Sequence, residues 1–127
     1  MLISDIYEVL QQHTHNLHYL NRYVKFIEQC AKQNEFLDPD TYVENHHICP
    51  KADDMFPEYI DLDIHTWNSC YLTARQHITA HLLLWKAFPK AMSQLNAVHY
   101  MCNVQNSDLC SISGRFIPIA IKNRYGA

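Results

Sequence analysis

The sequence predicts an α+β protein that is mostly helical, and three observations lead to this class. Apolar residues recur every three, four or seven positions between Ile6 and Ala31, which is the spacing of an amphipathic helix. Two short strand candidates, residues 42–44 and 48–49, precede Pro50. A second group of helix signals begins at Thr73.

The N-terminal segment, residues 4–34, is predicted to form one long amphipathic helix or two helices placed end to end. Its apolar stripe consists of Ile6, Leu10, Leu17, Leu20, Val24, Ile27 and Ala31. The Asp38-Pro39-Asp40 turn lies beyond its far end. Because the stripe has a heptad-like spacing, a homodimer formed through this helix is one hypothesis.

The middle segment, residues 41–70, is irregular. After the two strand candidates comes an acidic stretch, residues 53–63, which contains Pro57 and few helix signals. We expect this stretch to be a surface excursion, because connecting segments without a regular pattern usually run over the surface.

The third segment begins with a capping box, in which the Thr73 hydroxyl caps the first turn and Gln76 reaches back. The helix should stop near Phe88, because Pro89 disfavours helical geometry in the residue before it. A further helix is predicted over residues 90–102, with Leu95, Val98 and Cys102 inward.

Length and composition indicate one domain over residues 1–127, with a helical part (1–40), a central part (41–89) and a C-terminal helical extension (90–127). The chain has 127 residues, of which 48% are hydrophobic, enough for a modest core. It contains no apolar run of membrane-spanning length and no basic signal-peptide start, so we expect a soluble, cytoplasmic protein. Its five cysteines are scattered and fit neither a disulfide framework nor a zinc ribbon.

The net charge limits the ways in which this chain can bind nucleic acid. Ten basic residues stand against 13 acidic residues, giving −3 with neutral histidine. General nucleic-acid binders usually carry a surplus of positive charge. DNA binding by this chain would therefore need a local basic patch, and its non-specific affinity for DNA would be weak.

Histidine spacing indicates a metal site. His77 and His81 lie four residues apart on the capped helix and therefore project from one face. Such a pair is often only polar surface, but the His46-His47 doublet upstream offers a third imidazole. Three histidines leave room on a metal ion for water and a phosphate oxygen. The other member of the doublet would be free for proton transfer.

These residues resemble those of HNH endonucleases of phages, many of them homing-type enzymes. The resemblance rests on residues 46–51 (HHICPK), then Asn68, then residues 72–83 (LTARQHITAHLL). The order also resembles the nuclease domains of DNA-cleaving colicins, which have an acidic residue two positions before the doublet, here Glu44. The match spans roughly residues 42–89. It implies a ββα-metal motif between a long N-terminal helix and C-terminal helices, in a phage protein acting in the host cytoplasm.

The resemblance also implies a role for each matching residue. His46, His77 and His81 would hold one divalent metal ion (Zn, Mn, Ni or Mg), of which magnesium suits imidazoles least. His47 would be the general base, Asn68 would brace the loop that orients it, and Glu44 would orient a ligand. The site would hydrolyse phosphodiester bonds in DNA. Apart from the resemblance, Arg75 is a candidate contact to phosphate or a solvated surface residue, and Lys51 is a candidate for a local basic patch that contacts nucleic acid.

The sequence departs from the family at the loop before Asn68, which lacks the paired glycines common in the wider family and is rich in Asp and Glu. Two other interpretations stand beside the nuclease, and the negative charge favours the second of them. One is a module in which the ion only stabilises the fold. The other is a catalytically decayed HNH-fold protein that binds protein or DNA and keeps a structural metal.

Overall fold

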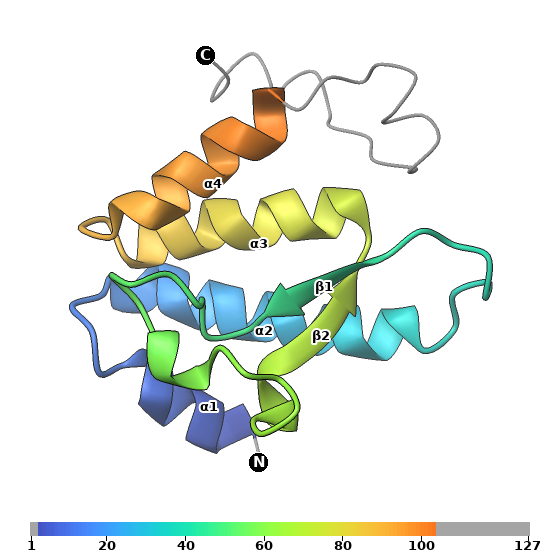
Figure 1. The fold of residues 1–127 in the computed structure, drawn as a ribbon, viewed down its shortest axis with the longest axis horizontal. Coiled ribbons are helices and arrows are strands. Elements are labelled where there is room, and N and C mark those ends of the chain that lie inside the picture. The colour runs from blue at the N-terminus through green and yellow to red at the C-terminus, as the bar shows by residue number, and fades with distance from the viewer. Residues whose placement is uncertain (1–2, 104–127) are drawn as a thin grey trace.

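The computed structural model describes residues 3–103 and confirms the mostly helical α+β class (Figure 1). The elements in chain order are α1 (Ile3–Leu10), α2 (Leu17–Asn34), β1 (Glu44–His47), the short 3-10 turns η1 (Pro57–Tyr59) and η2 (Thr66–Asn68), β2 (Ser69–Leu72), α3 (Ala74–Ala87) and α4 (Met92–Asn103). The part of the predicted C-terminal extension after residue 103 lies outside the described residues.

The N-terminal segment forms two helices rather than one. Asn16 caps α2 through its side chain, which accepts from the backbone N–H of Tyr19 at 3.2 Å. The buried face of α2 is Leu20, Tyr23, Ile27 and Cys30, whereas Leu17 is 52% exposed. The buried face of α2 is therefore rotated slightly about the helix axis from the apolar stripe that the sequence predicts. Ile6, Leu10, Leu20 and Ile27 all lie in the core of their own chain, so packing within one chain accounts for the spacing that prompted the dimer hypothesis.

The two strands form an antiparallel hairpin in which Glu44 pairs with Leu72 and His46 with Cys70. The predicted strands, residues 42–44 and 48–49, largely miss β1, which covers the polar residues between them. Pairing with β2, and not the intrinsic preference of Glu, Asn and His, makes this segment a strand. Because side chains alternate along a strand, Glu44 and His46 share one face of β1.

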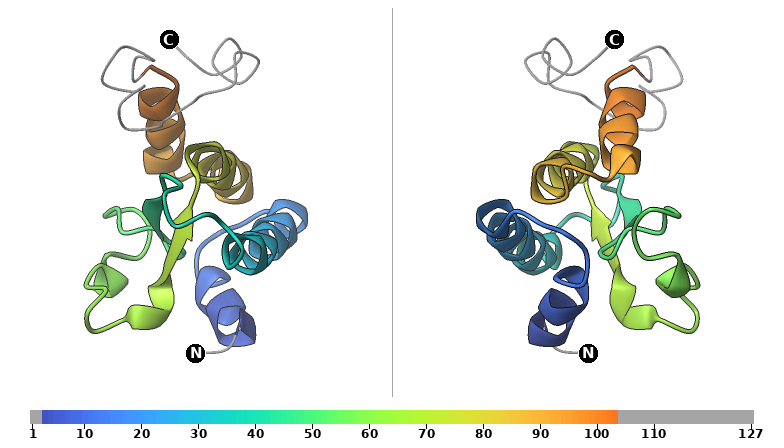
Figure 2. Two further views of the ribbon diagram at one scale, coloured as in Figure 1. Left: turned by 90° about the vertical axis from the view of Figure 1, so that its right-hand side faces the viewer. Right: turned by 90° about the vertical axis from the view of Figure 1, so that its left-hand side faces the viewer.

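The loop between the strands is only partly the surface excursion that its sequence predicts. Its acidic residues are exposed, but Met55 and Phe56 are buried in the main core. The Phe56 ring packs edge-on against Phe88, with ring centroids 6.5 Å apart. This expectation was wrong for the apolar pair, because two adjacent apolar residues among charged ones carry no periodicity. The views in Figure 2 show the hairpin between α2 on one side and this loop on the other.

The capping box at the start of α3 is confirmed. The Thr73 hydroxyl accepts from the Gln76 N–H at 3.2 Å, and the Gln76 side chain accepts from the Thr73 N–H at 2.9 Å. The helix ends at Ala87, next to Phe88, as Pro89 predicts. On α4, Val98 and Cys102 are buried as predicted, against Ile78 of α3, whereas Leu95 is half-buried. Helix α3 thus packs against α2 on one side and α4 on the other (Figures 1 and 2).

The described cysteines and helices bear on two further expectations. Cys30, Cys49, Cys70 and Cys102 are free thiols, and burial raises the pKa of Cys30 to about 11 and of Cys49 and Cys70 to about 12. Those three thiols are therefore protonated near neutral pH and are poor nucleophiles. Within residues 3–103, no helix is both long enough and apolar enough to span a bilayer.

Candidate metal centre

Three histidines from two elements converge beside the hairpin. His46 comes from β1, and His77 and His81 come from one face of α3. Their ring centroids lie 5.1 Å (His46 to each of the others) and 5.0 Å (His77 to His81) apart. One possible ligand atom from each residue lies within 4.8 Å of the other two. The fold therefore brings together the three imidazoles that the sequence selected, in a group that could hold a metal ion.

Burial keeps two of these imidazoles neutral. His46 is 1% exposed, and its burial lowers its pKa well below the ordinary value, with His81 and His77 adding to the effect. The pKa of His81 falls to about 4, again mainly because burial disfavours the charged ring and because His77 lies near. A neutral imidazole is the form that binds metals, so both rings are in the binding state near pH 7.

His77 is oriented by a carboxylate. Its Nδ1 lies 2.7 Å from Glu44 Oε1, and the other oxygen, Oε2, accepts from the Tyr42 hydroxyl at 2.6 Å. A carboxylate only accepts, so Nδ1 of His77 carries a proton, and in the neutral ring Nε2 keeps its lone pair. Glu44 thus contacts one of the three converging imidazoles.

His46 is oriented by a tyrosine of α2. The buried Tyr23 hydroxyl donates its single proton to the carbonyl of Ile48 at 2.6 Å. The same oxygen lies 2.8 Å from Nε2 of His46, so it must accept there. Consequently Nε2 carries the proton and Nδ1 of His46 has a free lone pair.

His81 is oriented from α4, where the side-chain oxygen of Gln94 lies 2.9 Å from its Nδ1. Each imidazole therefore directs one N–H outward to a protein acceptor and one lone pair inward. No hydrogen bond joins the three rings to one another among the bonds of residues 3–103. Three converging nitrogen lone pairs with supported outer N–H groups fit a divalent ion that keeps open coordination positions.

His47 lies next to this group and is oriented differently. Its Nε2 lies 3.0 Å from the carbonyl oxygen of Ile60, in the loop between the strands. A carbonyl cannot donate, so Nε2 carries the proton and Nδ1 is left with a lone pair that can accept one. His47 is thus prepared to act as a base through Nδ1.

Asn68 is fully buried and ties this loop to the end of β1. Its side-chain oxygen accepts from the Cys49 N–H at 2.6 Å. Its nitrogen donates to the Cys49 carbonyl at 3.1 Å and to the Tyr59 carbonyl at 3.2 Å. Because Tyr59 immediately precedes Ile60, these bonds hold the carbonyl that orients His47.

A pocket of about 430 Å³ opens beside the histidines. Its lining comes from β1, the segment after it, α3 and α4, and includes His46, His47, Lys51, His77, His81 and Gln94. Lys51 thus lines the same pocket as the histidines. Arg75 is exposed in the first turn of α3 and is not among the lining residues of this pocket.

Two residues that orient ligands were not selected from the sequence. Tyr23 lies on the buried face of α2, where a tyrosine hydroxyl needs a polar partner, and this is a signal that could have identified it. Gln94 has no such signal, because its partner is defined only when α4 packs on α3. Both contacts join segments that are far apart in the chain.

No protein-family description, curated protein or solved structure matches this chain.

Substitution of Asn68 by alanine should destabilise the protein strongly. It removes three hydrogen bonds, two to the buried backbone N–H and carbonyl of Cys49 and one to the partly buried carbonyl of Tyr59. At about 1–3 kcal/mol for a buried unsatisfied group, we expect a loss of roughly 2–4 kcal/mol in the free energy of unfolding, measured by urea denaturation. Asn96→Ala, at an exposed position of α4, is the control and should change stability by under about 0.5 kcal/mol. Equal stability of the two variants would contradict the bracing role.

Proposed function

We propose that this chain is a metal-dependent HNH endonuclease that hydrolyses phosphodiester bonds in DNA, with β1, β2 and α3 as its ββα-metal motif. One observation carries the proposal. One possible ligand nitrogen from each of three histidines lies within 4.8 Å of the other two, and a fourth histidine, whose Nδ1 makes no hydrogen bond within residues 3–103, lines the same pocket. This combination supplies a metal site and a separate base, the two parts that water-mediated cleavage of a phosphodiester needs.

His46, His77 and His81 would hold the ion. When bound there, a divalent ion supplies charge stabilisation to the scissile phosphate and to the leaving oxygen. Three imidazoles suit zinc, nickel or manganese better than magnesium, which prefers oxygen ligands. Glu44, Tyr23 and Gln94 keep the three rings in the orientation that presents a lone pair.

His47 takes a proton from the attacking water at Nδ1, while its Nε2–H remains bonded to the Ile60 carbonyl. That carbonyl also stabilises the imidazolium that forms, because its dipole is directed at the charged ring. Asn68 holds the loop, and thus the carbonyl, in place. The products are a 5′ phosphate and a 3′ hydroxyl.

Binding of DNA relies on few basic residues. Lys51 lines the pocket and is placed to contact a phosphate next to the scissile one, and Arg75 would contact phosphate further away. With a net charge of −3 and an acidic loop beside the hairpin, affinity should be low and should fall steeply with salt.

The second candidate function is a binding module with a structural metal, and the negative net charge favours it. In that case the ion would only hold β1 against α3. Structural zinc sites usually use four protein ligands and are closed to solvent. Here three histidines lie beside an open pocket, so the endonuclease is the better supported of the two.

Cleavage of supercoiled plasmid tests the proposal. Metal-stripped protein is resupplied separately with magnesium, manganese, nickel or zinc, and nicked circles are quantified with a single-stranded DNA and an RNA run in parallel. We expect cleavage only with a resupplied ion, with ends that carry 5′ phosphate. One tightly bound ion without cleavage of any of these substrates would favour the binding module.

A further inference from the structure

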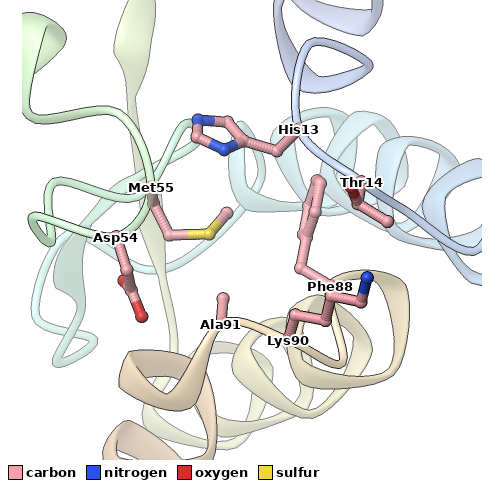
Figure 3. A pocket seen from close by; sticks show the side chains of 7 residues that line it. All are labelled: His13, Thr14, Asp54, Met55, Phe88, Lys90 and Ala91. Carbon is pink, nitrogen blue, oxygen red and sulfur yellow. The ribbon is translucent and has the colours of Figure 1, made fainter.

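The hydrogen bond between His81 and Gln94 continues to a carboxylate in the loop between the strands. Gln94 is buried, and its Nε2 donates to the Ser93 hydroxyl at 3.2 Å. That hydroxyl donates in a short hydrogen bond to Oδ1 of Asp54, and the Ser93 backbone N–H donates to Oδ2 at 3.1 Å. Figure 3 shows the Asp54 carboxylate beside Ala91, directed toward the start of α4.

The directions of these bonds determine one another. The Asp54 carboxylate only accepts, so it receives the single hydroxyl proton of Ser93. The Ser93 oxygen must then accept from Gln94, which places the amide nitrogen toward Ser93 and the amide oxygen toward His81. An amide oxygen only accepts, so His81 carries its proton on Nδ1.

We propose that Asp54, Ser93 and Gln94 are positioning residues that hold His81 in the tautomer that binds metal. The proposal rests on the metal site of the proposed function, whether or not the site cleaves DNA. With the amide reversed, its N–H₂ would face His81, whose Nδ1 would have to accept. The proton would then be on Nε2, directed into the cluster, and the ring could not act as a ligand.

His81 needs this arrangement more than the other two ligands do. Glu44 has no donor to offer His77, and the Tyr23 proton is committed to a backbone carbonyl. Gln94 is the partner whose two orientations have nearly the same shape but opposite hydrogen-bonding character. The Ser93–Asp54 pair decides between them, and it makes α4 and the loop part of the metal site.

The test measures the tautomer and the metal affinity separately, on the full chain. Long-range ¹H–¹⁵N spectra of ¹⁵N-labelled, metal-free protein report which nitrogen of His81 is protonated. Competition with a chromophoric chelator gives the dissociation constant for Zn²⁺. The variants are Ser93→Ala, Ser93→Thr, Gln94→Glu and Gln94→Leu, with Asn96→Ala as a control on the same helix.

We expect the Nδ1–H form of His81 in the wild type and a mixture of tautomers in Ser93→Ala, with roughly tenfold weaker Zn²⁺ binding. Gln94→Leu should weaken binding roughly 10–100-fold, the usual effect of removing a hydrogen-bond partner of a ligand. Ser93→Thr, which keeps the hydroxyl, should retain the Nδ1–H form and bind Zn²⁺ as the wild type does. Gln94→Glu, which offers His81 acceptors only, should retain the Nδ1–H form.

Three results would overturn the proposal: the Nε2–H form in the wild type, wild-type tautomer and affinity in both Ser93→Ala and Gln94→Leu, or a loss equally large in Asn96→Ala. A protein that shows the expected shifts but cleaves no nucleic acid would retain the positioning role and lose the nuclease function. Cleavage by the wild type, together with wild-type Zn²⁺ affinity in both Ser93→Ala and Gln94→Leu, would retain the nuclease function and overturn the positioning role.

Discussion

His47→Ala is expected to reduce metal-dependent DNA cleavage by about 10²–10⁴-fold, the usual contribution of a general base, while the protein still binds one metal ion. His47 is the one histidine of these four that does not belong to the candidate metal-binding group. Its Nε2 is bonded to the Ile60 carbonyl. Removing it should therefore affect proton transfer and leave the ligands in place. The measurement is the initial rate of plasmid nicking under saturating metal.

His18→Ala is the matched control, because His18 is an exposed histidine on α2 and far from the cluster in the chain. It should cleave at the wild-type rate. If His47→Ala also cleaved at that rate, His47 would not be the base. If it lost the metal as well as the activity, its role would be that of a ligand and not of a base.

Saturation with Zn²⁺ is expected to raise the melting temperature of the metal-stripped protein by roughly 10 °C. A ligand present at 100 times its dissociation constant stabilises the folded state by about 2.7 kcal/mol, and 1 kcal/mol corresponds to several degrees in a domain of this size. The physical reason is that the ion joins β1 to α3, two elements that meet through the histidine cluster. Thermal unfolding followed by circular dichroism, with and without metal, measures the shift.

His77→Ala should abolish this shift, and His18→Ala should keep it. His77 is the best ligand to remove, because it is less buried than His46 and its loss leaves a smaller defect in the core. A wild-type shift of under about 1 °C with every divalent ion would contradict the metal site. An equal shift in His77→Ala would place the ion elsewhere.

The parts of this structure that could be predicted from sequence are those specified by local signals. The start of α3 follows from the Thr73–Gln76 capping box and its end from Pro89, and both were correct. The pairing of His77 with His81 follows from helix geometry alone. These features need no knowledge of distant segments, because the interactions that specify them lie within one helical turn.

The features that were missed depend on contacts between distant segments. The position of β1 depends on its pairing with β2, and its residues have little intrinsic preference for a strand. Met55 and Phe56 are buried in the main core, where Phe56 packs against Phe88. No local sequence pattern encodes such a contact between distant segments. Tyr23 and Gln94 come from α2 and α4, so their roles are visible only after both helices pack around the cluster.

If one ion held by His46, His77 and His81 makes this chain a nuclease, cleavage must depend on a single equivalent of metal. The most direct test titrates metal-stripped wild-type protein with manganese, nickel or zinc and measures plasmid cleavage at each ratio of metal to protein. We expect activity to rise in proportion to added metal and to level off at one equivalent, with no activity in His77→Ala. Cleavage that is absent at every ratio, or that is equal in wild type and His77→Ala, would contradict a nuclease that depends on this ion.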